Sequence, residues 1–160
     1  MEIEPLPSAS ISKIIGLLEI IDDAGGKESL NRISRDETIE LGEIIAVAKG
    51  AAMLNLLEVK RGRAQITETG KKFLVSPIPE RKKMIKERLK EIPVLRLILD
   101  AVKRASEKAV EKEFLIEYFV ILFPDRDPEE IFTTAVDWAR YAELFGYNAE
   151  REELYLDQEF

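Results

Sequence analysis

Cysteine and histidine are both absent from this sequence of 160 residues. Their absence excludes disulfides, thiolate nucleophiles and imidazole catalysis, and it removes the usual ligands of a zinc site. Only a site built from carboxylate and carbonyl oxygens stays open to a metal ion. The composition therefore favours a binding or regulatory protein over an enzyme.

The chain also lacks any apolar run near the roughly 18 residues that a membrane-spanning helix needs. Its first ten residues, MEIEPLPSAS, have neither the basic stretch nor the apolar stretch of a signal peptide. We therefore expect no membrane insertion and a cytoplasmic location. With 46% apolar residues and a net charge of −7, the composition is that of a folded globular protein. Only three methionines beside abundant Ile, Glu and Lys suit an archaeal or thermophilic source.

Apolar residues recur at helical spacing through most of the first half of the chain. This periodicity predicts helices over 10–24, 28–33 and 38–54. Alternation on both sides of a turn at Arg61 and Gly62 then predicts a β-hairpin over 56–67, and Thr67 is placed to cap a short helix after it. Three helices followed by a hairpin form a winged-helix pattern.

The second half repeats this order in outline. Helices are predicted over 80–92, 95–105, 111–123 and 128–145, and a second hairpin over 146–156. The third of these helices, with the run FLIEYFVILF, is unusually apolar. We predict a mainly α fold of two winged-helix-like units joined by a basic helix, with domains at 1–76 and 77–160. The linker helix belongs to the second domain.

Charge is distributed unevenly along the chain. Residues 77–112 hold eleven Lys and Arg against six Asp and Glu, whereas residues 113–160 hold three against thirteen. The basic middle is expected to attract the acidic end, in the same chain or in a neighbour.

A winged helix also suggests DNA binding, usually through its third helix. Here that helix carries one cation, Lys49, together with Glu40 and Glu43. The other candidate phosphate contacts are Lys60, Arg61 and Arg63 in the first hairpin, and a solvated turn explains them equally well. Because phosphate contacts need several cations, a DNA-binding transcriptional regulator is the alternative function, and nucleic acid binding is disfavoured.

No motif in the sequence indicates a catalytic site or a cofactor-binding site. Phosphate-binding loops and nucleophile elbows are absent. The segment DRDPEE at 125–130 begins like a calcium loop, but it lacks the required glycine and distal glutamate. A helix start explains it better, with Asp127 as the N-cap and Pro128 in the first turn. We predict no catalytic residue, no cofactor and no metal.

The last predicted helix provides the candidate interaction residues, Trp138, Arg140, Tyr141 and Glu143. Trp138 shares its face with apolar residues, and ion pairs along a side face are expected from Asp137, Arg140 and Glu143, which are three residues apart. A core helix with a row of ion pairs explains this pattern. Tryptophan, tyrosine and arginine together are also the composition of an interface hot spot.

Three stretches of the chain together resemble one family: LPSASISKIIGLLEIIDDAGG at 6–26, ITETGKKF at 66–73 and DWARYAELFGYN at 137–148. It is the AAA-associated C-terminal domain, found after the ATPase in some archaeal and bacterial ATP-binding subunits of nitrate/sulfonate/bicarbonate-type ABC transporters. The similarity extends from about Leu6 to Tyr155, and the run from Trp138 to Glu143 is its most specific part.

The resemblance implies a regulatory or interaction domain without catalysis, whose partner is the ATP-binding subunit of an ABC importer. In the family the ATPase precedes this domain, and it is absent from this sequence. We therefore interpret the chain as a free-standing version, which would act in trans, or as an excised piece. A homodimer is left open.

Overall fold

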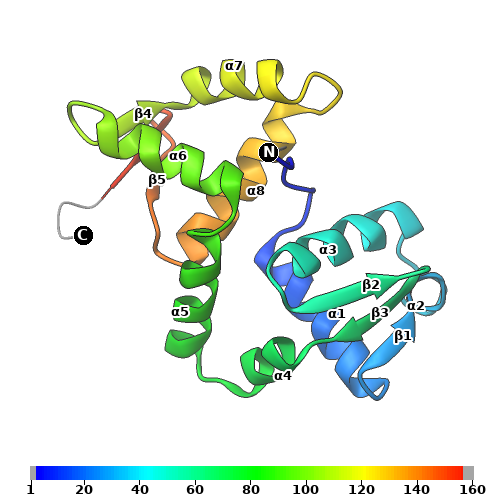
Figure 1. Ribbon diagram of the computed structural model, residues 1–160. Coiled ribbons are helices and arrows are strands. Elements are labelled where there is room, and N and C mark those ends of the chain that lie inside the picture. The colour runs from blue at the N-terminus through cyan, green and yellow to red at the C-terminus, as the bar shows by residue number, and fades with distance from the viewer. Residues whose placement is uncertain (1–2, 157–160) are drawn as a thin grey trace. The chain divides into compact units, whose positions relative to one another are not determined.

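The computed structural model describes residues 3–156, which fall into two compact units (Figure 1). One unit is Pro7–Met84. The other begins at Ile85 and also takes in the few residues that precede Pro7. Within the described residues the fold consists of eight helices and two small antiparallel sheets. The prediction of a mainly α fold is thereby confirmed.

The first unit combines four helices with a three-stranded sheet. The sheet has the strand order β1-β3-β2, and both neighbouring pairs are antiparallel. Apolar residues of α1 and α3, including Ile14, Leu18 and Val47, are buried in the core. The elements are α1 Ile11–Asp23, β1 Lys27–Ser29, α2 Leu30–Glu37, α3 Leu41–Met53, β2 Leu57–Lys60, β3 Arg63–Ile66 and α4 Glu68–Val75.

The second unit repeats the element order helix, strand, helix, helix, strand, strand (Figure 1). Its sheet has the order β4-β6-β5, which is the arrangement of the first sheet. Trp138 and Phe119 are the largest side chains buried in its core. The elements are α6 Pro93–Arg104, β4 Ala109–Glu111, α7 Lys112–Leu122, α8 Pro128–Tyr141, β5 Gly146–Asn148 and β6 Glu153–Tyr155, and they follow α5 Ile78–Leu89.

A third strand in each sheet departs from the sequence-based prediction. The pattern of residues predicts a hairpin alone in each unit, and it assigns Glu28 and Ser29 to a helix. In the structure, Lys27 lies opposite Gln65 and Ala109 lies opposite Tyr155, so β1 and β4 each join a hairpin distant in sequence. A strand of three residues is too short to show alternation, and its partner strand is remote, so no local signal could reveal it.

The helices α3 and α8 end in the same way. At the end of α3, Asn55 adopts a left-handed φ of 64°, and the amide of Leu56 donates to the carbonyl of Ala51 at 2.9 Å. At the end of α8, Glu143 has a φ of 57°, and the amide of Leu144 donates to the carbonyl of Ala139 at 2.8 Å. Both turns are Schellman motifs. Each motif ends its helix and turns the chain toward the strand that follows. Because of this turn, α8 ends four residues earlier than its periodicity predicts.

The threonine and glycine of the ITETGKKF segment have a structural role. The Thr67 hydroxyl accepts a hydrogen bond from the amide of Gly70 at 2.9 Å and donates to the carbonyl of Asn55 at 2.7 Å. The predicted cap is therefore present. A Cβ on Gly70 would collide with the carbonyl oxygen of Leu56 and approach a side-chain carbon of Ile66 at 2.7 Å. Thr67 and Gly70 together hold α4 against the turn that ends α3.

Candidate functional site

The helix α7 carries large apolar side chains on its outer face as well as on its inner face. Leu115 and Phe119 are buried. On the outer face, Phe114, Tyr118 and Ile121 keep 54%, 37% and 79% of their surface exposed. The helix α2 holds the equivalent place in the first unit, and its exposed positions are Asn31, Arg32, Arg35, Asp36 and Glu37. An apolar outer face on a single short helix is typical of an interaction surface.

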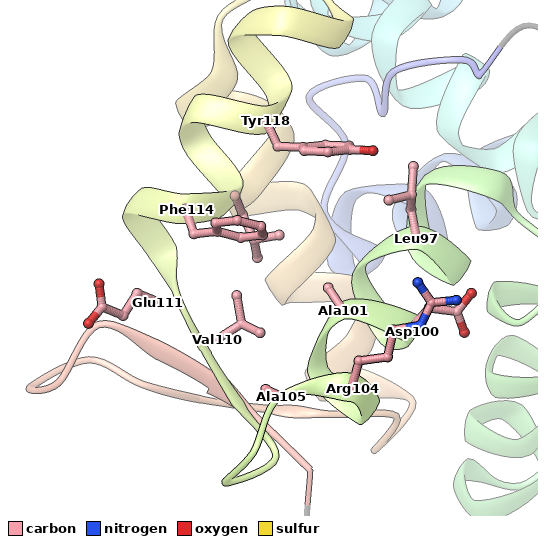
Figure 2. A pocket seen from close by; sticks show the side chains of 10 residues that line it. Leu97, Asp100, Ala101, Arg104, Ala105, Val110, Glu111, Phe114 and Tyr118 are labelled. Atoms are coloured by element: carbon pink, nitrogen blue, oxygen red, sulfur yellow. The ribbon is translucent and has the colours of Figure 1, made fainter.

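The outer face of α7 borders a groove of about 720 Å³ that it shares with α6 and β4 (Figure 2). The groove is lined by small side chains, Ala101, Ala105 and Val110. Phe114 and Tyr118 rise from α7, with their ring centroids 6.4 Å apart and their planes at 27°. Figure 2 shows the Tyr118 ring extending from α7 toward α6. The arrangement is an open apolar slot with an aromatic wall.

The second wall of the groove is formed by α6, and it adds both apolar and charged groups. Leu97, Asp100 and Arg104 line the groove from this side, and Glu111 lines it at the end of β4 (Figure 2). Asp100, Arg104 and Glu111 are all exposed. Charged groups therefore lie at the margins of the groove, and the apolar groups lie between them.

Residues 31–148 match the family described as the C-terminal AAA-associated domain. The chain belongs to this family. No curated protein and no solved structure gives a further match. The matched residues of the AAA-associated domain begin in α2 and end in β5, so they include parts of both units. They contain the groove and the Trp138–Glu143 run, but not the 6–26 stretch. The predicted membership of the AAA-associated family is thereby confirmed.

Lys112 opens α7 of the AAA-associated domain, and its charge is engaged by α8. Its ammonium lies 3.0 Å from the carboxylate of Glu129 and 5.3 Å from the centroid of the Phe132 ring. The hydrogen bond that Lys112 donates to Glu129 is the main cause of its raised pKa, and burial opposes this effect. The pair joins the first turn of α7 to the first turn of α8. Both helices that build this side of the unit are thus tied together at their N-termini.

The structure separates the predicted interaction residues of α8. Trp138 is completely buried, whereas Arg140 and Glu143 are exposed and Tyr141 is half-buried. Trp138 therefore belongs to the core of the unit and does not share a surface with Arg140. Glu143 sits in the left-handed turn described above, so its position is set by the backbone of that turn. Of the four predicted interaction residues, Arg140 and Tyr141 remain candidates for contact with a partner.

Of the four predicted phosphate contacts, three lie close together and the fourth, Lys49, lies on another element. Lys60 and Arg63 lie opposite each other in the β2–β3 register, with Arg61 in the turn between them at a φ of 53°. Lys49 is exposed on α3, a different element. That helix also exposes Leu41, at 40% of its surface. Three cations therefore share one turn, and the exposed side of α3 adds only Lys49, beside the acidic Glu43.

Periodicity alone does not indicate the α6–β4–α7 groove, and none of its residues is among the predicted sites. The relevant signal is the run FLIEYFVILF, which has more apolar residues than one helix face can bury. Which of these residues are covered depends on α6 and α8, which pack only in the folded unit.

Within residues 3–156, no cluster of three or more acidic side chains is placed to hold a metal ion. In the same part of the chain, no helix combines the length and the apolar character needed to cross a bilayer.

Proposed function

We propose that this chain is a non-catalytic interaction domain that regulates the ATP-binding subunit of an ABC importer of the nitrate/sulfonate type. The observation that carries the proposal is the family match over residues 31–148. The family is described by its association with AAA proteins, and the sequence resemblance points to ABC transporter ATPases among them. A chain without cysteine or histidine is better suited to binding than to catalysis.

The repeated topology supports an interpretation of both units as winged-helix-like. In each unit a helix, a short strand and two helices precede a hairpin, and the short strand completes a three-stranded sheet. We retain functional domains at 1–76 and 77–160, of which residues 1–2 and 157–160 lie outside the described residues. Winged-helix units bind proteins as well as DNA, so the fold is compatible with both functions.

Surface chemistry favours protein over DNA as the partner. The exposed side of α3 presents Leu41 and Ile45 beside a single cation, Lys49. A DNA-reading helix needs polar groups for base edges and several cations for phosphates. No comparison supports a transcriptional regulator. The apolar outer face of α7 instead fits a protein surface.

We propose that Arg140 and Tyr141 lie at the rim of one contact surface, with Trp138 supporting them from the core. Arginine and tyrosine are enriched among residues that dominate binding energy. Their helix is anchored by a completely buried tryptophan, so the backbone that carries them is rigid. A rigid backbone lowers the entropy that binding must overcome.

The decisive experiment is a binding titration between the purified chain and the ABC ATP-binding subunits encoded in the same genome. We expect one of them to bind with a dissociation constant of about 10 µM or tighter by calorimetry, and its ATPase rate to change on saturation. Serum albumin at the same concentration serves as the negative control. Failure of every subunit to bind at about 100 µM would reject the proposed function.

A further inference from the structure

We infer that the free edge of β2 pairs with the same edge of a second copy of this chain, in an antiparallel arrangement centred on Val59. Such a pairing is isologous, since a two-fold axis at Val59 places the same surface on both sides of the interface. It joins the first-unit sheets of the two copies into one continuous sheet. Its existence does not depend on the proposed function, which concerns the ATPase.

The outer side of β2 offers backbone groups for hydrogen bonding. This strand lies at one edge of the first sheet, with β3 as its neighbour (Figure 1). Lys60 and Arg63 flank a turn of two residues, Arg61 and Gly62, whose φ values of 53° and 76° indicate a type I′ hairpin. The residues that flank such a turn are hydrogen-bonded to each other, and the next residue along each strand faces outward. The amide and carbonyl of Val59 therefore point away from β3, and among residues 3–156 no hydrogen bond outside the helices and ladders uses them.

A groove of about 620 Å³ lies along this edge, and we call it the β2 groove. All four residues of β2 line it, together with the end of α3 and the start of α4. Val59 is 38% exposed, and its neighbours Glu58 and Lys60 are exposed as well. The β2 groove is therefore open to an extended segment, which binds a sheet edge through main-chain hydrogen bonds.

The side chains of β2 determine which strand fits beside it. Glu58 and Lys60 are the charged residues that line the β2 groove, and Val59 lies between them. Antiparallel partners run in opposite directions, so the best partner has an acid opposite Lys60, an apolar residue opposite Val59 and a base opposite Glu58. Read from its own N-terminus, that partner is Glu-Val-Lys, which is the sequence of residues 58–60 itself. A second copy thus supplies two Glu58–Lys60 pairs and one Val59–Val59 pair.

A second copy also relieves an unfavourable pair within the single chain. Lys60 lies directly opposite Arg63 in the β2–β3 register, and like charges in that position are destabilising. Within the described part of the chain, neither Lys60 nor Glu58 takes part in an ion pair. Pairing would place Glu58 of the copy on the free side of Lys60, so each lysine gains an opposite charge.

The remaining charges near the β2 groove lie farther apart across the two-fold axis. Strand dimensions place each Glu58–Lys60 pair about 5 Å apart at Cβ, Lys60 and its copy about 8 Å apart, and Arg61 and its copy about 14 Å apart. The screening length is about 10 Å at 0.1 M salt, so the opposite pairs outweigh the like pairs. Lys49 and Glu68, on the adjoining helices, are exposed and do not line the groove.

The other edge strands lack this self-complementarity. A centred two-fold pairing of β1 would place Glu28 against its own copy, and Lys27 would face Ser29. The strand β4 has a single charged residue, Glu111, and β5 has none. Among the edge strands of the described residues, β2 is therefore the one whose pairing with itself creates opposite-charge pairs.

Sedimentation equilibrium of the full chain tests the pairing. We expect a monomer–dimer equilibrium with a dissociation constant of about 200 µM or tighter at about 0.1 M salt. Glu58→Lys and Lys60→Glu each place like charges opposite each other, so each should weaken dimerisation at least about tenfold. The variant with both substitutions restores the opposite charges and should dimerise within about threefold of the wild type.

A mixture of the two single variants distinguishes pairing between chains from an effect within one chain. Glu58→Lys supplies cations and Lys60→Glu supplies acids, so the mixture should form heterodimers although each variant alone stays monomeric. Lys27→Glu is the matched control, because it reverses an exposed charge on β1, at the other edge of the same sheet. It should leave the dissociation constant unchanged.

Val59→Pro tests the backbone hydrogen bonds. Proline is tolerated on an edge strand where the amide faces outward. The variant should therefore keep the circular dichroism of the wild type and dimerise at least about tenfold more weakly. If it does not fold, the charge variants still decide the question, since they alter exposed side chains.

A chain that remains monomeric at about 1 mM overturns the inference. So does a dimer that the single charge reversals leave unchanged, or one that Lys27→Glu weakens as much as they do. Restoration by the double variant without heterodimers in the mixture would also overturn it, because the charges would then act within one chain. None of these outcomes involves the ATPase, so failure of the proposed function would be seen separately, in the ATPase titration.

Discussion

Substituting alanine for two helical glycines should change stability in opposite directions. Gly16 lies inside α1, and an added Cβ would meet nothing within 4 Å. Alanine has the better helix propensity, so Gly16→Ala should stabilise the first unit by up to about 1 kcal/mol. Gly70 lies in the first turn of α4, where the same Cβ would collide with the carbonyl oxygen of Leu56.

The collision at Gly70 should outweigh the gain in helix propensity. The obstacle is backbone held by the turn after α3, so it cannot move aside as a flexible side chain would. Overpacking costs about 1–3 kcal/mol, and an immobile backbone obstacle places Gly70→Ala in the upper part of that range. Subtracting the propensity gain of up to about 1 kcal/mol leaves a net loss of about 1–2 kcal/mol for Gly70→Ala. The two variants should therefore differ by about 2–3 kcal/mol, or at least about 8 °C in melting temperature for a unit of this size.

Urea unfolding followed by circular dichroism measures both variants on the same scale. The single tryptophan, Trp138, lies in the second unit, so its fluorescence reports whether that unit is affected. If Gly70→Ala is neutral or stabilising while Gly16→Ala behaves as expected, the argument is refuted that Gly70 is required because the backbone at Leu56 approaches it closely.

Three further predictions concern the core, the ion pair and nucleotide binding. Trp138→Ala should lower the free energy of unfolding by about 3–5 kcal/mol, because the side chain is completely buried. Arg140→Ala should lower it by under about 1 kcal/mol and should weaken ATPase association at least about tenfold. A large loss of stability with unchanged association would mean that Arg140 is structural. Lys112 has a raised pKa in the folded state, mainly through its hydrogen bond to Glu129. The pair should therefore stabilise the protein fully below the ordinary lysine pKa of 10.5, and this effect should be lost as the pH rises through the higher pKa of the folded state. The stability difference between wild type and Lys112→Met, under about 1 kcal/mol, should therefore shrink only at strongly alkaline pH, and shrinkage between pH 7 and 9 would contradict the assignment. Finally, the purified chain should show no saturable ATP binding at about micromolar concentration by equilibrium dialysis, because no phosphate-binding loop is present.

Much of the secondary structure could be predicted because it depends on neighbours in the sequence. Helical periodicity located seven helices and the spacing around Arg61 and Gly62 located the first hairpin, since both patterns are complete within one element. The cap at Thr67 was likewise predictable, because capping involves residues three apart. The family followed from short motifs, of which the Trp138–Glu143 run supplies a core side chain and the turn that ends α8.

Only the folded units decide which apolar side chains are covered. The strands β1 and β4 exist because distant hairpins supply their hydrogen bonds, and three residues carry no periodic signal. Trp138 and Arg140 are two residues apart, yet the packing of α8 buries the first and exposes the second. The apolar run of α7 has the same hydrophobic character on both faces, so composition cannot tell Phe119 from Phe114. The inner face is buried because it meets the core of the unit, and the outer face stays open because α6 and β4 leave a groove beside it.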